Sequence, residues 1–171
     1  FLHSSAEFAK ADEYYDKALK LEPENPEALS FSALNKIHTK GFDEGTKRIE
    51  KALSITGEEP FMMFIAARLK FLQEDFESAK EYLVRSCEIE NKSDTQNLLA
   101  LTYCELGNYM QANNIFRSLL ESSPVNVNLL LSSAKCYEKL EDTKTALEQL
   151  EKAVEIFPEC EEAHEMIRRL S

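Results

Sequence analysis

The four cysteines are the side chains of this sequence with the greatest potential for chemistry. Cys87, Cys104, Cys136 and Cys160 are separated by 17, 32 and 24 residues, and no two of them form a C-x-x-C pair. Structural zinc sites draw their thiolates from such closely spaced pairs, and a chain of this size needs no disulfide to hold its core. We therefore interpret the cysteines as reduced, buried side chains and expect no metal site.

The other titratable residues form no catalytic pattern. The histidines are isolated from one another and from the cysteines. Acidic pairs such as Glu58–Glu59 and Glu161–Glu162 are typical of solvated helix ends. The sequence has no Gly-rich phosphate loop and no nucleophile motif. We predict that the chain is not an enzyme and needs no cofactor.

Composition narrows the class of protein and of partner. The chain has 171 residues, of which 43% are hydrophobic and 30% charged, with only four Gly and five Pro. Scarce turn residues favour helices. A net charge of −11 argues against nucleic acid or an anionic membrane as the main partner, and no apolar run is long enough for membrane insertion. We expect a cytoplasmic protein and, because the sequence opens on Phe1, a chain that continues upstream.

The elements that must position any site are revealed by an internal repeat. Five 18-residue segments, from "AEFAKADEYYDKALKLEP" (6–23) to "EDTKTALEQLEKAVEIFP" (141–158), begin 34, 34, 33 and 34 residues apart. Each has a small sixth residue, a large tenth residue, a thirteenth residue that is small in all segments but one, and a final breaker or turn residue. Steps of four and three place the small and large residues on one helical face, and Pro ends the helix. The sixth and tenth residues are Ala11 and Tyr15, Gly45 and Ile49, Ala79 and Leu83, Ala112 and Phe116, and Ala146 and Leu150.

A second type of helical stretch lies between these segments. It carries a large residue followed by smaller ones three and four places later, as in Met63, Ala66 and Ala67 of "PFMMFIAARLKFL" (60–72). Those residues should face the neighbouring helices. Short connectors between the two types of helix predict antiparallel pairs.

The pattern resembles the tetratricopeptide repeat, a 34-residue helix–turn–helix with W-x2-L-G-x2-Y, then A-x3-F and a late Pro. The second-helix half matches well, and Tyr103 and Tyr137 match the first-helix half. The chain departs in having no Trp, and in placing Lys36 and Lys70 where Tyr is usual. The resemblance covers essentially the whole chain. It implies an all-α, right-handed superhelical solenoid of about ten helices.

The repeat register predicts the organisation of a single domain, 1–171. A terminal helix with a narrow apolar stripe should cap the solenoid. The predicted parts are a partial repeat 1–25, full repeats 26–59, 60–92, 93–126 and 127–160, and the capping helix 161–171.

The resemblance also implies that the first helices line a concave binding face. In family members that hold the acidic tails of heat-shock chaperones, Lys, Asn and Arg on successive first helices clamp a carboxylate. In this chain the matching slots do not form such a clamp, so we predict that the protein is not a chaperone-tail adaptor. In two registers they hold Ser30, Leu34, Ile65, Asp94 and Leu98, or Phe64, Arg68, Leu98, Asn128 and Ser132.

A surplus apolar stripe on the stretch 60–72 predicts where a partner binds. Residues at i, i+3, i+4, i+7, i+10 and i+11 from Phe61 should point into the concavity, and neighbouring first helices extend the stripe. Polar Lys135, Glu138 and Lys139 should form a rim. The predicted partner-binding groove consists of Phe31, Leu34, Ile37, Phe61, Phe64, Ile65, Arg68, Phe71, Leu98 and Leu101.

Three occupants of this groove stay open at this stage. They are the apolar face of a partner's helix, a segment of the same chain that folds back, and a second copy of the protein. The function that we predict is a non-catalytic scaffold that binds a segment of another protein. The alternatives are a self-assembly module that forms a homo-oligomer and a regulatory arm of a larger multidomain protein.

Overall fold

The computed structural model describes residues 2–171, and Phe1, where the predicted partial repeat begins, lies outside the described residues. Over that range the chain forms ten helices and no strand, as the sequence predicts. The helices are α1 (Leu2–Leu21), α2 (Pro26–Thr39), α3 (Phe42–Thr56), α4 (Pro60–Leu72), α5 (Phe76–Ile89), α6 (Ser93–Glu105), α7 (Tyr109–Ser122), α8 (Val127–Lys139), α9 (Thr143–Ile156) and α10 (Glu161–Leu170).

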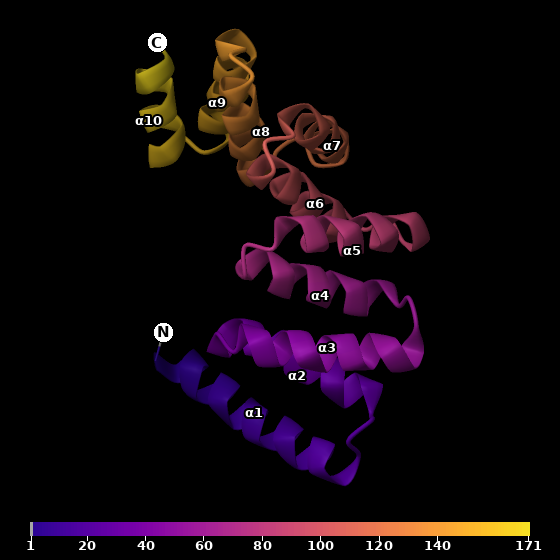
Figure 1. The fold of residues 1–171 in the computed structure, drawn as a ribbon. Helices are drawn as coiled ribbons and strands as arrows, with labels where there is room; N and C mark the ends of the chain where they lie inside the picture. Colours follow the sequence, from indigo (N-terminus) through magenta and orange to yellow (C-terminus); the bar gives the residue numbers. More distant parts are fainter. Residues whose placement is uncertain (1) are drawn as a thin grey trace. The chain divides into compact units, whose positions relative to one another are not determined.

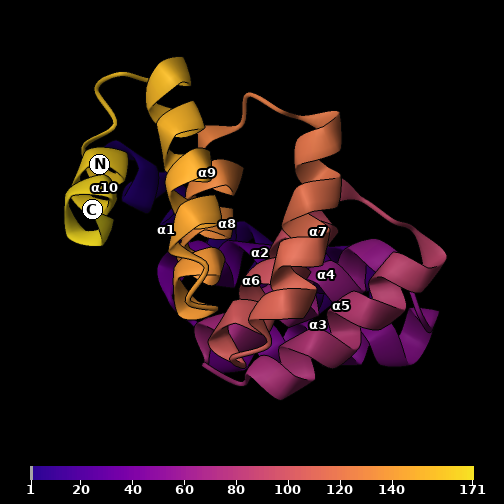
Figure 2. The same ribbon diagram turned by 90° about the horizontal axis from the view of Figure 1, so that it is seen from above.

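The helices form two compact units, residues 1–95 and 96–171. In the first unit α1 packs against α2, α2 against α3, α3 against α4 and α4 against α5, and α2 also packs against α4 (Figure 1). In the second unit α8 packs between α7 and α9, and α10 packs against α9 (Figure 2). The even-numbered helices α2 to α8 are therefore the first helices of the repeats, and the odd-numbered helices are the second ones.

Helix starts are fixed by polar side chains that satisfy free backbone N–H groups. Asn25, Glu59 and Asn126 accept from the backbone at the starts of α2, α4 and α8, and Asp75 and Asp142 do so at α5 and α9. Pro occupies the first turn of α2 and α4, where its missing N–H costs nothing. These caps set where α2, α4, α5, α8 and α9 begin.

The turn from the first to the second helix of each repeat uses one left-handed residue. Lys40, Glu74, Gly107 and Glu141 occupy this repeat position, with φ values of 59°, 62°, 74° and 60°. A left-handed conformation costs a residue with a Cβ roughly 1–2 kcal/mol. Gly107 is therefore the one residue of the four that suits this position without strain.

The core follows the small–large–small pattern that the sequence predicts. Ile49, Leu83, Phe116 and Leu150 are fully buried, and the small residues that flank them on their helices α3, α5, α7 and α9 are buried or nearly so. Tyr15 of α1 is only half-buried. The first-helix residues Met63, Ala66 and Ala67 are also buried, which confirms that they face other helices.

Gly45, the small residue of α3, lies in close contact with both neighbouring helices. A Cβ placed there would lie 2.9 Å from Cδ2 of Leu69 and 3.0 Å from Cβ of Lys36. The other described second helices have Ala at this position. The Gly at this point lets α3 sit against both α2 and α4.

Candidate partner-binding surface

Two exposed aromatic side chains from successive first helices form the most prominent feature of the predicted site. Phe31 of α2 and Phe61 of α4 are 45% and 39% exposed. Their ring centroids lie 6.2 Å apart at an interplanar angle of 54°, which is within the range of favourable aromatic pairs. The pair presents a continuous apolar ridge on one side of the first unit.

A pocket of about 230 Å3 adjoins this ridge. Phe61 and Phe64 contribute its aromatic wall, and the end of α5 and the start of α6 contribute polar groups. Lys92, on the opposite wall, is paired with Glu90 at 2.8 Å. The pocket combines an apolar wall with charged edges, a mixture that suits one apolar side chain of a ligand. It is lined by Pro60, Phe61, Phe64, Ser86, Glu90, Lys92, Asp94 and Thr95.

Arg68 lies on the same face of α4, one turn beyond Phe64. Its guanidinium carbon is 5.7 Å from the centroid of the Phe64 ring, a cation–π geometry. Within the described part of the chain no carboxylate forms an ion pair with Arg68, although neighbouring Lys70 has two. Its guanidinium therefore lies against an aromatic ring and has no carboxylate partner among the described residues.

The prediction for Ile65 is wrong. Ile65 is fully buried and belongs to a core cluster with Leu29 and Ala33 of α2. It sits about 40° around the helix from Phe61, on the side where α2 packs against α4. This contact removes Ile65 from any surface that a partner could reach.

The remaining predicted residues of the first unit are partly accessible. Leu34 and Ile37 are half-buried and pack on the same core cluster. Phe71 is half-buried and meets the edge of Phe76 at a centroid distance of 5.3 Å. These three side chains pack mainly against neighbouring residues and add little exposed apolar area to the ridge.

A buried lysine occupies the first of the two positions where the sequence has Lys in place of Tyr. Lys36 of α2 is 8% exposed, and its ammonium nitrogen lies 3.0 Å from Asp12 of α1 and 3.0 Å from Glu44 of α3. Burial opposes the ionisation of Asp12, but hydrogen bonds from Asn35 and Lys36 outweigh it, so the pKa of Asp12 is lowered. Burial likewise opposes the charge of Lys36, but its two acidic partners outweigh this, and its pKa is raised.

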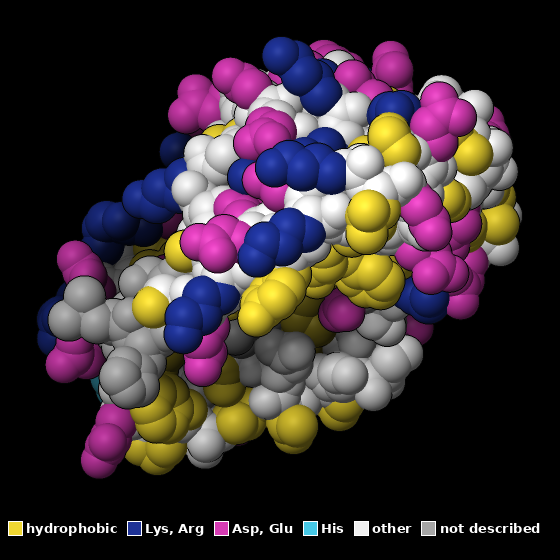
Figure 3. Space-filling view, turned by 90° about the horizontal axis from the view of Figure 1, so that it is seen from below, with side chains coloured by type: hydrophobic (Ala, Val, Ile, Leu, Met, Phe, Trp, Pro, Cys, Tyr) yellow, Lys and Arg dark blue, Asp and Glu magenta, His cyan; other side chains and the backbone are white. Residues whose placement is uncertain are grey.

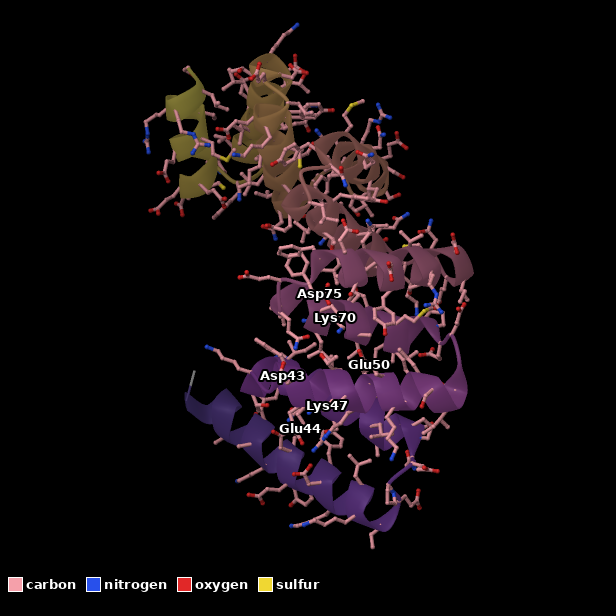
Figure 4. The ribbon with its side chains drawn as sticks, in the orientation of Figure 1. Asp43, Glu44, Lys47, Glu50, Lys70 and Asp75 are labelled. Carbon is pink, nitrogen blue, oxygen red and sulfur yellow. The ribbon has the colours of Figure 1, made fainter. Side chains whose placement is uncertain are left out.

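Lys70 of α4 occupies the equivalent position in the next repeat and is also ion-paired. Its nitrogen lies 3.5 Å from Glu50 of α3 and 3.7 Å from Asp75. The side-chain amide of Gln73 adds a further polar contact by donating a hydrogen bond to the carboxylate of Asp43 at 2.6 Å. Figure 4 labels Lys70 and these acidic residues where the end of α4 meets α3. Ion pairs thus replace aromatic packing between helices at both positions.

The predicted residues of the second unit lie on a separate pocket of about 520 Å3. Leu101 forms part of its apolar wall, whereas Leu98 is half-buried and outside the lining. The predicted rim residues Lys135, Glu138 and Lys139 line this pocket. It is bounded by Leu101, Cys104, Glu105, Tyr109, Ser132, Lys135, Cys136, Glu138, Lys139 and Arg169.

Two cysteine thiols lie side by side in this pocket wall. The Sγ atoms of Cys104 on α6 and Cys136 on α8 are 2.8 Å apart, and both residues are free cysteines. One thiol can donate its S–H to the other. This hydrogen bond and burial raise the pKa of Cys104, and the same hydrogen bond lowers the pKa of Cys136 against the effect of burial.

On the face drawn in Figure 3, charged side chains of both signs are present. Figure 3, which views the molecule from below relative to Figure 1, shows acidic and basic side chains interspersed, with hydrophobic side chains between them. Among the described residues no group of three or more His, Cys, Asp and Glu side chains is arranged to hold a metal ion. None of the helices in that part of the chain has the length and hydrophobicity to cross a membrane.

Comparison with protein families identifies the repeat. Two family models, each described as tetratricopeptide repeat, match residues 1–25 and 103–170. The chain belongs to the tetratricopeptide repeat family. Its helix pairs and small–large–small core are thus the features of this tetratricopeptide repeat protein that the sequence pattern predicts. No curated protein matches it in sequence.

Solved structures share the fold of this tetratricopeptide repeat protein. YrrB, described as a TPR protein with an unusual peptide-binding site, has a TM-score of 0.84 at 24% identity, over 98% of this chain and 87% of its own. MamA has a TM-score of 0.81 at 19% identity, over 90% and 91%. A thermophilic TPR protein of Thermus thermophilus has a TM-score of 0.69 at 18% identity, over 99% and 91%. The fold class is the all-α tetratricopeptide repeat solenoid, which in general supports a protein–protein interaction scaffold.

Sequence reasoning treated the cysteines one by one and so missed their pairing in this tetratricopeptide repeat protein. Cys104 and Cys136 are 32 residues apart, close to the repeat period, and both lie on first helices. Residues one period apart on first helices tend to be neighbours in a repeat protein. That spacing was the signal that could have revealed the pair.

Proposed function

We propose that this protein is a non-catalytic scaffold that binds an amphipathic helix of a partner protein on the first helices α2 and α4. The exposed pair of Phe31 and Phe61 carries the proposal. Two large aromatic side chains held together in water leave apolar area that binding can bury, at roughly 1.5–3 kcal/mol for each side chain that becomes fully covered. Aromatic residues are the usual anchors of such interfaces.

A helical ligand suits the arrangement of apolar features. The Phe31–Phe61 ridge offers an elongated apolar surface, and the pocket beside Phe61 and Phe64 can accept one apolar side chain. An amphipathic helix presents apolar anchor residues at i, i+3 or i+4, and i+7. Such anchors can pack along the ridge, and one of them can enter the pocket. The peptide-binding site named for YrrB supports peptide recognition by this fold.

Arg68 gives the proposed site a polar specificity element. Its guanidinium lies against the ring of Phe64, and the side chain is partly exposed. A carboxylate on the partner's helix, near the anchor that enters the pocket, would pair with it in a bidentate contact. The partner that we propose is therefore an amphipathic helix with an acidic residue beside its apolar face.

The test uses a displayed library of helical peptides, selected for binding to the purified protein. Selected peptides should be rich in apolar residues at helical spacing and contain an acidic residue. The variant Phe31→Glu plus Phe61→Glu should bind them at least tenfold more weakly, because it places charge on the ridge. A matched control, Tyr14→Glu plus Leu21→Glu, alters two exposed apolar residues of α1 and should bind normally. Circular dichroism should show unchanged helix content in both variants.

Two outcomes would overturn the proposal. In the first, peptides bind equally well to the ridge variant and to the control. In the second, light scattering shows that the wild-type protein is an oligomer that the ridge variant dissociates. The ridge would then join copies of the protein, as the alternative of self-assembly requires.

A further inference from the structure

The pair of cysteines in the second unit forms a site that the proposed scaffold function does not use. Cys104 and Cys136 come from the first helices of two successive repeats, α6 and α8, and their sulfur atoms are 2.8 Å apart. We propose that these two thiols are a redox site, which a peroxide oxidises reversibly to an intramolecular disulfide.

The geometry places the sulfur atoms close to bonding distance. A disulfide bond is about 2.05 Å long, so the bond closes with less than about 1 Å of relative movement. Cys87 and Cys160 make no such contact with another cysteine among the described residues.

The pocket supplies access to the pair. Both cysteines line the pocket of about 520 Å3, and its charged lining is of mixed sign, with Lys135, Lys139 and Arg169 beside Glu105 and Glu138. Cys104 is partly exposed, whereas Cys136 is only 1% exposed. A small oxidant such as a peroxide can reach the pair through this pocket.

The reaction balances with one peroxide molecule. One thiol of the pair, as its thiolate, attacks one oxygen of hydrogen peroxide, the O–O bond breaks, and the departing hydroxide takes up a proton to become water. That cysteine is then a sulfenic acid. The second thiol attacks this sulfur, the S–O bond breaks, and the leaving hydroxide takes the proton of the second thiol to become a second water. Two thiols have lost two electrons, which reduce the peroxide.

The disulfide would link α6 covalently to α8 and close a loop, residues 104–136, that contains α7. Cross-linking restricts the unfolded chain and raises stability. Leu101 lines the same pocket as the two cysteines, so oxidation would also alter a surface on the first-helix side of the second unit. The inference rests on the thiols alone and does not depend on the partner proposed above.

The experiment oxidises the reduced wild-type protein with hydrogen peroxide and then alkylates the remaining thiols. Mass spectrometry of the intact chain should show the loss of two hydrogen atoms and two alkylated cysteines instead of four. Peptide mapping should find Cys104 joined to Cys136. The rate constant should not depend on protein concentration, the melting temperature should rise by several degrees, and dithiothreitol should reverse both changes.

Single variants test whether both thiols are required. Cys104→Ser and Cys136→Ser should each abolish the internal cross-link, and in at least one of the two variants the remaining cysteine of the pair should accumulate a sulfenic acid that a dimedone probe traps. Cys87→Ser is the matched control and should form the cross-link at the wild-type rate. The proposal is overturned if wild-type peptide mapping finds oxidation without a Cys104–Cys136 bond, or finds that Cys87 or Cys160 forms the main disulfide. Wild-type mapping decides this even if a variant fails to fold.

Discussion

The ammonium nitrogen of Lys36 lies 3.0 Å from a carboxylate oxygen of Asp12, and the two side chains are only 10% and 18% exposed. Asp12 also accepts hydrogen bonds from Asn35 at 2.6 Å and from Thr39 at 3.3 Å. The contact joins α2 to α1 through charge at a repeat position where the family pattern has an aromatic residue. A buried charge is tolerated only when it is paired, so both residues depend on this contact.

Replacing Lys36 by Met should therefore destabilise the protein even though Met fits the apolar surroundings. The variant leaves Asp12 largely buried without its cation, which costs about 1–3 kcal/mol. Urea unfolding followed by circular dichroism measures the loss. The control Lys47→Met changes an exposed lysine of α3 and should shift the free energy of unfolding by less than about 0.5 kcal/mol. Equal effects of the two substitutions would show that the buried ion pair contributes nothing.

The contribution of this ion pair should depend on pH in a defined direction. The folded-state pKa of Asp12 is lowered from 3.8, so its stabilising effect is present above that value and is lost as the pH falls through the folded pKa. The folded-state pKa of Lys36 is raised from 10.5, so its effect is present below that value and is lost as the pH rises through the folded pKa. The difference in unfolding free energy between wild type and Lys36→Met should be constant from about pH 5 to 9 and shrink below pH 4. A difference that persists unchanged at pH 2 would contradict the role of Asp12.

The helix pairs and the core could be predicted from the sequence because they depend on a local period. The large residues Ile49, Leu83, Phe116 and Leu150 recur in register, and all are buried. The partners of Lys36 could not be predicted, because Asp12 lies 24 residues away on another helix. A helical pattern gives the face on which a residue lies but not the side chain that it meets across the interface.

The same limitation explains which part of the candidate site could be predicted. Phe61, Phe64, Arg68 and Phe71 lie on the accessible side of α4, as the stripe pattern indicates. Ile65 lies at the edge of that stripe, and the position of the edge depends on how closely α2 approaches α4. That distance is set by the tertiary packing of the two helices. The sequence pattern of α4 alone does not determine this packing.

Alanine substitutions at Ile65 and Phe61 should separate core from surface within one turn of α4. Ile65→Ala removes a fully buried side chain and should cost about 2–5 kcal/mol of stability. Phe61→Ala removes a side chain that is 39% exposed and should cost about 1 kcal/mol or less, although it should weaken peptide binding at the ridge. Urea unfolding of both variants gives the comparison. A larger loss for Phe61 than for Ile65 would mean that the ridge is part of the core.

Replacing Glu141 by Gly should stabilise the protein, because this residue holds the left-handed turn between α8 and α9 with a φ of 60°. Relief of the left-handed strain should raise the free energy of unfolding by about 1–2 kcal/mol. The greater conformational freedom of Gly in the unfolded chain should lower it by about 0.5–1 kcal/mol. The expected net gain is about 0.5–1 kcal/mol, seen as a higher urea midpoint with an unchanged slope. Gly107 already occupies the equivalent turn between α6 and α7.

The matched control is Glu151→Gly, which places Gly at an exposed position inside α9. This substitution should lower the free energy of unfolding by about 1 kcal/mol. Destabilisation by both substitutions would show that Glu141 makes a contact in the turn that outweighs its strain.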